Sequence, residues 1–135
     1  MPQPRQYDQF RVLVVDDHQL SLKLVTKQLE IIGFSDIDVL RNGEEALNRM
    51  EEEHYDIVFL DWAMPVMDGL TFLKKCTSRD EFKNIAFVMV SAEAQSSQIM
   101  ETIKAGAVSY VVKPVELHDL QEKVDKVIDW INKRK

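Results

Sequence analysis

The chain has 135 residues, of which 45% are hydrophobic and 30% are charged, the balance of one folded domain rather than of a disordered segment. Its formal net charge of −6 argues against a domain that binds nucleic acid or an anionic membrane by itself. Cys76 is the single cysteine, so no internal disulfide can form, and the sequence contains neither a signal peptide nor a membrane-spanning run; we expect a cytoplasmic protein.

Short predicted strands alternate with longer amphipathic helices. A nearly continuous apolar run at 11–15 predicts a strand that is buried on both faces. From 18 to 32 apolar residues recur at helical spacing, and Gly33 follows where a helix commonly ends in a left-handed residue. A short strand is predicted over 37–40 and a charged helix over 44–53.

The same alternation continues to the end of the chain. Further strands are predicted over 56–61, 85–90 and 108–112, and further helices over 70–76, 96–105 and 117–131. The last helix carries a wide apolar stripe, which is typical of a helix that packs against a sheet. The stripe consists of Leu117, Leu120, Val124, Val127, Ile128 and Ile131.

Five strand–helix units in a chain of this length predict an α/β domain, with a parallel sheet covered by helices on both faces. We place the domain at 10–132, between an N-terminal tail (1–9) and a short basic C-terminal tail (133–135). The pattern leaves the strand order open. In such sheets, ligands bind at the carboxyl ends of the strands, beside the point where the strand order reverses.

Five polar residues stand at the ends of four predicted strands. Asp16 and Asp17 follow the first strand, Asp61 ends the third, Ser91 follows the fourth and Lys113 follows the fifth. Three carboxylates close together repel each other, which raises their pKa values unless cations are present. A few carboxylates with water and phosphate suit Mg²⁺, and Lys113 supplies a second positive charge.

A carboxylate beside Mg²⁺ and an ammonium group is equipped for phosphoryl transfer. Asp61 could attack phosphorus while the two cations neutralise the phosphoryl oxygens, and Ser91 could donate a hydrogen bond to one of them. Each residue alone also has a structural explanation: Asp17 as a helix cap, Asp61 as a loop acid, Ser91 as a turn residue, and Lys113 as the extended residue before a proline. The joint pattern is much harder to produce by chance.

Four motifs contain these residues: Val-Val-Asp-Asp at 14–17, Leu-Asp-Trp-Ala-Met-Pro-Val-Met-Asp-Gly at 60–69, Ser-Ala-Glu at 91–93 and Tyr-Val-Val-Lys-Pro at 110–114. In this order they resemble the signature of the receiver domain of response regulators, the CheY-like family of two-component signalling. The resemblance covers about 10 to 132 and implies a flavodoxin-like doubly wound sheet of strand order 2-1-3-4-5.

The resemblance also implies a role for each matching residue of the metal site. Asp16 and Asp17 match the acid pair that holds Mg²⁺, and Asp61 matches the phosphoacceptor, which also binds the metal. Ala63 matches the residue whose backbone carbonyl is a metal ligand. Many relatives carry a larger or amide-bearing side chain there, which bears on the lifetime of the phosphoryl group because it borders the path of attacking water.

The remaining implied roles concern the phosphoryl group and the switch. Ser91 and Lys113 match the hydroxyl residue and the lysine that contact the phosphoryl group. Tyr110 matches an aromatic switch residue that turns inward when the hydroxyl residue moves. The output would be altered binding at the surface of the fourth helix, fifth strand and fifth helix.

As a receiver, the chain would take its phosphoryl group from a histidine kinase or a histidine phosphotransfer domain and act on a downstream protein. It would be a monomer or a phosphorylation-dependent dimer, and would catalyse only its own phosphorylation and dephosphorylation. A stand-alone regulator, as in chemotaxis, and a receiver excised from a longer regulator or hybrid kinase both fit.

Two other functions are disfavoured. A haloacid dehalogenase-type phosphatase needs a second acid where this chain has Ala63, and an interaction module with a dead acceptor would not need the complete polar set. We interpret His18, which follows the acid pair, as a helix-start residue rather than a metal ligand.

Overall fold

The computed structural model describes residues 6–134, and its centre is a parallel sheet with the strand order β2-β1-β3-β4-β5. Val12 of the interior strand β1 pairs with Ile37 of β2 on one side and with Ile57 of β3 on the other. The strands are β1 (Arg11–Val15), β2 (Asp36–Leu40), β3 (Ile57–Asp61), β4 (Ala86–Ser91) and β5 (Ser109–Val112). This topology confirms the flavodoxin-like α/β fold.

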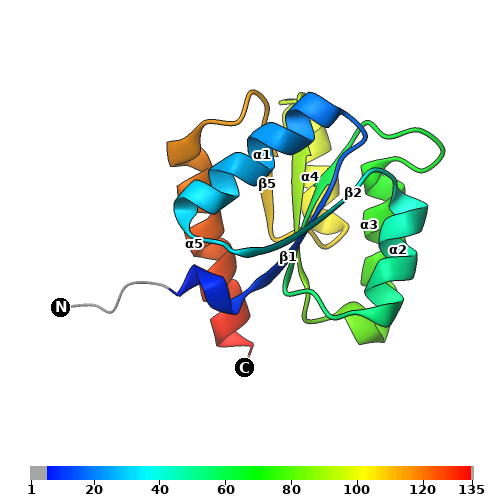
Figure 1. Cartoon of the computed structure of the whole chain (residues 1–135). Helices are drawn as coiled ribbons and strands as arrows, with labels where there is room; N and C mark the ends of the chain where they lie inside the picture. Colours follow the sequence, from blue (N-terminus) through cyan, green and yellow to red (C-terminus); the bar gives the residue numbers. More distant parts are fainter. Residues whose placement is uncertain (1–5, 135) are drawn as a thin grey trace.

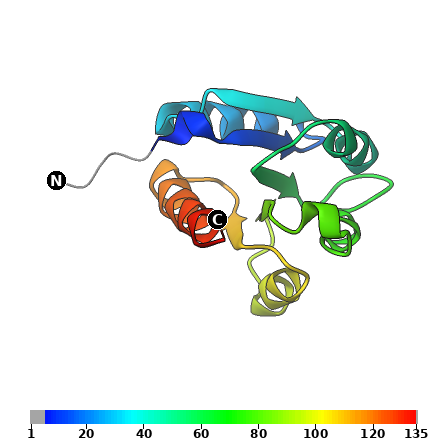
Figure 2. The same cartoon turned by 90° about the horizontal axis from the view of Figure 1, so that it is seen from below.

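Within residues 6–134, five α-helices cover the sheet in two layers. Helices α1 and α5 lie on one face, and α2, α3 and α4 lie on the other (Figures 1 and 2). The helices are α1 (Gln19–Ile32), α2 (Gly43–Glu52), α3 (Gly69–Thr77), α4 (Ser96–Lys104) and α5 (Leu117–Lys133), and the short 3₁₀ turns are η1 (Tyr7–Gln9) and η2 (Asp80–Phe82).

Alternate residues of the strands belong to two separate hydrophobic cores, one on each face of the sheet. Val12 and Val14 face α1 and α5, whereas Leu13 and Val15 face α2 and α3. All four side chains are buried, because side chains along a strand point alternately to the two faces and both faces are covered. The apolar run that predicted a strand buried on both faces is therefore explained.

The predicted boundaries of the helices and strands lie within two residues of the observed ones. Two of the helix starts are marked in the sequence by residues whose side chains cap the helix. The side chain of Asn42 accepts the Glu45 N–H at 2.8 Å at the start of α2, and Asp68 accepts the Thr71 N–H at 2.8 Å at the start of α3. One core prediction is wrong: Leu117 is 40% exposed, because it is the first residue of α5 and stands beyond the packed part of the stripe.

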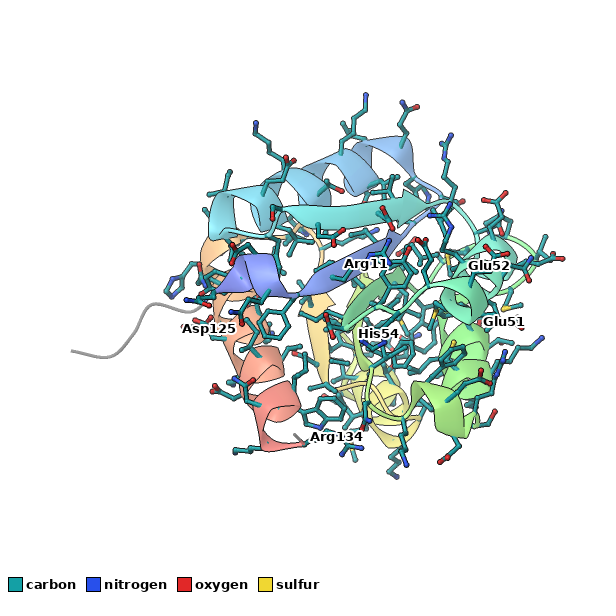
Figure 3. All side chains as sticks on the ribbon, turned by 60° about the horizontal axis from the view of Figure 1, so that its bottom comes forward. Arg11, Glu51, Glu52, His54, Asp125 and Arg134 are labelled. Atoms are coloured by element: carbon teal, nitrogen blue, oxygen red, sulfur yellow. The ribbon has the colours of Figure 1, made fainter. Side chains whose placement is uncertain are left out.

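The chain segment before β1 packs against the domain from η1 onward. Tyr7 contacts the ring of Phe34 edge-on at 5.3 Å between ring centres. Its hydroxyl donates to Asp125 at 2.8 Å and accepts from the Gln121 side chain at 2.8 Å, and Figure 3 shows Asp125 on α5 near this turn. Of the predicted N-terminal tail, residues 1–5 lie outside the described residues.

At the other end of the chain, α5 continues through Lys133, and the guanidinium of Arg134 lies over the Trp130 ring at 4.4 Å. Of the predicted basic tail, Lys135 lies outside the described residues. No helix within residues 6–134 combines the length and the apolarity that a membrane crossing requires.

A cluster of charged side chains around Arg11 lies at the end of the sheet opposite to the predicted site. Arg11 contacts Asp38 at 3.3 Å and Glu53 at 3.1 Å, and its guanidinium lies 4.9 Å from the centre of the Tyr55 ring. The fully buried Tyr55 donates its hydroxyl to Asp38 at 2.6 Å. Figure 3 views the molecule from this end, with Arg11 and His54 close to one another.

Candidate functional site

The loops that follow the strands gather at the top of Figure 1 and bring the predicted site residues to one edge of the sheet. Asp16 comes directly after β1, and Asp61 is the last residue of the neighbouring strand β3. Ser91 ends β4, and Lys113 follows β5. Asp16, Asp61 and Ser91 are buried.

The carboxylates form a group that could hold a metal ion. One oxygen each of Asp16, Asp17 and Asp61 and a ring nitrogen of His18 all lie within 4.8 Å of one another. Asp17 Oδ1 and Asp61 Oδ2 are buried and accept no hydrogen bond. A nearby cation stabilises buried carboxylate oxygens that accept no hydrogen bond, and the oxygens of the three acids suit a hard ion such as Mg²⁺.

Lys113 joins the two buried acids. Its Nζ donates to Asp61 Oδ1 at 3.1 Å and to Asp16 Oδ2 at 3.2 Å. Asp16 follows β1, Asp61 ends the neighbouring strand β3, and Lys113 follows β5. This one ammonium group therefore links the middle of the sheet to its β5 edge. The second oxygen of Asp61, Oδ2, accepts no hydrogen bond, whereas the second oxygen of Asp16, Oδ1, accepts the His18 backbone N–H.

The two acids that share Lys113 have pKa values shifted in opposite directions. Burial raises the pKa of Asp61, and the charge of Asp16 raises it further, against the opposing pull of Lys113. Burial also acts to raise the pKa of Asp16, but hydrogen bonds from the His18 backbone and the Ser21 side chain, together with Lys113, outweigh it and lower that pKa. Of these two acids, Asp61 therefore has the less compensated charge.

His18 lies closer to the acids than its interpretation as a helix-start residue implied. It is the residue before α1, as expected, and its backbone N–H donates to Asp16 Oδ1 at 2.9 Å. Its Nδ1 also lies 3.2 Å from Asp17 Oδ1 and 3.4 Å from Asp61 Oδ2. The charge of Asp17, with that of the other two acids, raises the pKa of the His18 imidazole.

A cavity of about 330 Å³ opens beside the acids, lined by residues of β3, β4 and α4 and of the loops around them. Ala63 is exposed at its rim, so its small side chain leaves this approach open. Gln98 of α4 also lines it, with a buried Oε1 that accepts no hydrogen bond. The sequence did not single out Gln98, because one amide on a predicted helix carries no pattern.

The two predicted switch residues meet at Glu93. Ser91 Oγ accepts the Glu93 N–H at 3.1 Å, and the Tyr110 hydroxyl donates to the Glu93 carbonyl oxygen at 2.8 Å. Tyr110 is only 6% exposed and belongs to the core beneath α3 and α4. In this structure the ring therefore already occupies an inner position.

The loop after β3 contains one unusual backbone conformation. Val66 has φ +70°, a left-handed conformation that β-branched residues rarely adopt, and its side chain is fully exposed. Sequence reasoning missed this feature, since nothing in the local pattern distinguishes Val66 from an ordinary loop residue.

The family model described as the response regulator receiver domain matches residues 12–125. The chain belongs to the response regulator receiver family. Receiver domains are signalling modules. The CheY-type resemblance is supported by a chemotaxis protein, CheY-3 of Vibrio cholerae, which is 34% identical over 119 residues, or 88% of this chain and 92% of that protein. The chemotaxis protein CheY of Pseudomonas aeruginosa is 32% identical over 122 residues, or 90% of this chain and 98% of its own.

Solved receiver structures share the fold. A CheY-like receiver domain from Methanospirillum hungatei superposes with a TM-score of 0.83 at 28% identity, covering 93% of this chain and 98% of that one. A CheX–CheY–BeF₃–Mg complex from Borrelia burgdorferi superposes with a TM-score of 0.82 at 34% identity, covering 88% of this chain and 89% of that one.

Proposed function

We propose that this receiver is a phosphorylation-dependent switch whose phosphoacceptor is Asp61 and whose cofactor is Mg²⁺. Asp16, Asp17, Asp61 and the backbone carbonyl of Ala63 would hold the metal, and Ser91 and Lys113 would contact the phosphoryl group. The observation that carries the proposal is the pair of contacts from Lys113 Nζ to Asp61 and Asp16, beside buried acid oxygens that accept no hydrogen bond.

The proposed reaction transfers a phosphoryl group from a phosphohistidine of a histidine kinase or phosphotransfer domain. One oxygen of Asp61 forms a bond to phosphorus as the phosphorus–nitrogen bond breaks, and the donor imidazole leaves with the bonding electrons and takes up a proton. Bound Mg²⁺ would neutralise charge on the phosphoryl oxygens. Lys113 holds the Asp61 carboxylate in place and places a positive charge beside it.

The relatives support this proposal. The Borrelia burgdorferi structure is described as a complex of CheX and CheY with BeF₃ and Mg, and beryllofluoride stands in for a phosphoryl group. For this chain, the proposed output is a changed affinity for a downstream protein at the surface of α4, β5 and α5. A phosphoryl oxygen that accepts from Ser91 would disturb the Glu93 contacts shared with Tyr110, which border that surface.

The decisive experiment is intact-mass analysis after incubation with phosphoramidate and Mg²⁺. We expect one added phosphoryl mass on the wild type, none on Asp61→Asn, and none when EDTA removes the metal. Asp68→Asn is the matched control, because it lies in the same loop and an asparagine keeps the cap of α3; it should label like the wild type. Undiminished labelling of Asp61→Asn, or labelling in EDTA, would refute the proposal.

A further inference from the structure

The outer side of α1 exposes a row of large apolar side chains. Leu20 is 82% exposed, Leu24 46% and Ile31 59%. They lie on the side of the helix opposite to the residues that it buries in the core. Of the eight exposed large hydrophobic residues in the described part of the chain, these three share one helix and a fourth, Val39, lies on the adjacent strand β2.

The spacing along α1 is that of a two-helix seam. Leu20, Leu24, Lys27 and Ile31 are separated by four, three and four residues, the alternation found where two helices pack side by side. Three of the four positions are apolar and the third is a lysine. A single polar residue in such a seam fixes the register of the pair at some cost in stability.

When two copies of α1 run antiparallel, the charges beside the seam of one copy face opposite charges on the other copy. Lys23 and Glu30 lie seven residues apart on the same side of the seam, since both line the groove of about 400 Å³ between α1 and β2. Turning a second copy end over end brings Lys23 of one helix beside Glu30 of the other, twice. In a parallel pair, Lys23 and Glu30 of the two copies would lie on opposite sides of the seam and could not pair.

We propose that α1 is a self-association surface, on which the α1 helix of a second copy packs antiparallel about a two-fold axis. Leu20 of one copy packs against Ile31 of the other, and Leu24 packs against the methylene stem of Lys27. Lys23 and Glu30 form two equivalent ion pairs over the grooves. The contact is isologous, so it closes at a dimer rather than growing into a fibre.

This dimer is expected to be weak. The 14 residues of α1 span about 21 Å. We expect two helices of this length to bury less surface than the roughly 1,200 Å² of a small specific interface. We therefore expect a dissociation constant of roughly 0.1 mM, in a range where the local concentration of the protein decides its state. Salt should weaken the dimer, because the ion pairs are exposed.

Sedimentation equilibrium of the unphosphorylated protein, from roughly 10 µM to 1 mM, tests the proposal. Leu24→Asp should abolish the dimer, because it places an acid in the seam. Ile103→Asp is the matched control: Ile103 on α4 is 44% exposed, nearly as much as Leu24, and its variant should dimerise like the wild type. A wild type that is monomeric throughout this range, or an Ile103→Asp variant that loses the dimer equally, would overturn the proposal.

Charge reversal tests the antiparallel register. Lys23→Glu and Glu30→Lys alone should each weaken the dimer several-fold, because each places like charges opposite one another. The double variant Lys23→Glu/Glu30→Lys should recover the wild-type dissociation constant. Failure of the double variant to recover would exclude the antiparallel pair. The measurement needs neither metal nor phosphate, so its outcome is independent of the proposed phosphorylation of Asp61.

Discussion

Gly69 lies against the backbone of the proposed acceptor. A β-carbon added to it would stand 2.3 Å from the carbonyl oxygen of Asp61 and 2.9 Å from the α-carbon of Trp62, and its own N–H donates to the Trp62 carbonyl at 2.8 Å. Backbone atoms cannot move aside as a flexible side chain can. The absence of a side chain at Gly69 thus allows α3 to begin directly beside the end of β3.

We therefore expect Gly69→Ala to lower the free energy of unfolding by roughly 2 kcal/mol or more and to slow phosphorylation by small-molecule donors, because the Asp61 backbone must shift. Gly43→Ala is the control at the same position of α2, where the added carbon meets only side chains, at 3.2 Å from both Met67 and Phe72. Urea denaturation and the phosphorylation rate check both variants. Equal effects at the two glycines would contradict this explanation.

Residue by residue, the sequence predicted the position of polar side chains that end strands. Asp16, Asp61 and Lys113 meet as expected, because parallel strands deliver their carboxyl ends to one edge. The sequence could not predict that His18 turns toward the acids or that Gln98 reaches the cavity. Those placements depend on side-chain rotamers and on the position of α4, which no local periodicity encodes.

At the scale of elements, η1 joins the two helices on one face of the sheet. Tyr7 packs on Phe34, just after α1, and hydrogen-bonds to Asp125 and Gln121 of α5. Gly33 makes room for it, since a β-carbon there would come within 2.9 Å of the Tyr7 ring. The sequence suggested only a polar tail here, because a single aromatic residue before the first strand has no periodicity from which packing could be predicted.

We expect Tyr7→Ala to lower the free energy of unfolding by about 2 kcal/mol, through the loss of partly buried aromatic contacts and of the hydroxyl bonds. Tyr7→Phe should cost about 1 kcal/mol, because it removes only the hydroxyl. Urea denaturation measures both variants. If Tyr7→Ala were as stable as the wild type, η1 would be attached to the domain without stabilising it.

For the whole molecule, the buried Cys76 thiol and Tyr55 hydroxyl make the free energy of unfolding depend on pH in the alkaline range. Burial raises the pKa of the Cys76 thiol from 9.0 to about 12. Burial and the hydrogen bond to Asp38 raise the pKa of Tyr55 from 10.0 to about 12. Between pH 9 and pH 12 the unfolded chain has lost protons that the folded chain retains.

The unfolded state therefore binds fewer protons in this window, and the free energy of unfolding should fall as the pH rises above about 9. Urea denaturation from neutral pH to about pH 11 measures the slope. Cys76→Ala should make the fall shallower, whatever the stability of that variant at neutral pH. A stability that does not change between these limits would show that neither group keeps its proton in the folded state.

The overall architecture was the most predictable level, because alternating strand and helix patterns and their caps are local in sequence. The strand order was not accessible from pattern alone; it came from the resemblance and is confirmed by the pairing of β1 with both β2 and β3. The burial of Leu117 was overestimated for a related reason, since a stripe on a helix does not show where the sheet beneath it ends.

Strand order also decides where the sheet can open. The strands β1, β3 and β4 are hydrogen-bonded along both edges, whereas β2 and β5 are bonded along one. Amide exchange through local opening should therefore begin in β2 and β5 and reach β3 last. Asp61 ends β3 and Lys113 follows β5, so we expect an opening of β5 to withdraw the ammonium group while the carboxylate of Asp61, the proposed acceptor, stays in place. We therefore expect the edge strand β5, rather than β3, to govern how long the Lys113 ammonium group stays beside this carboxylate.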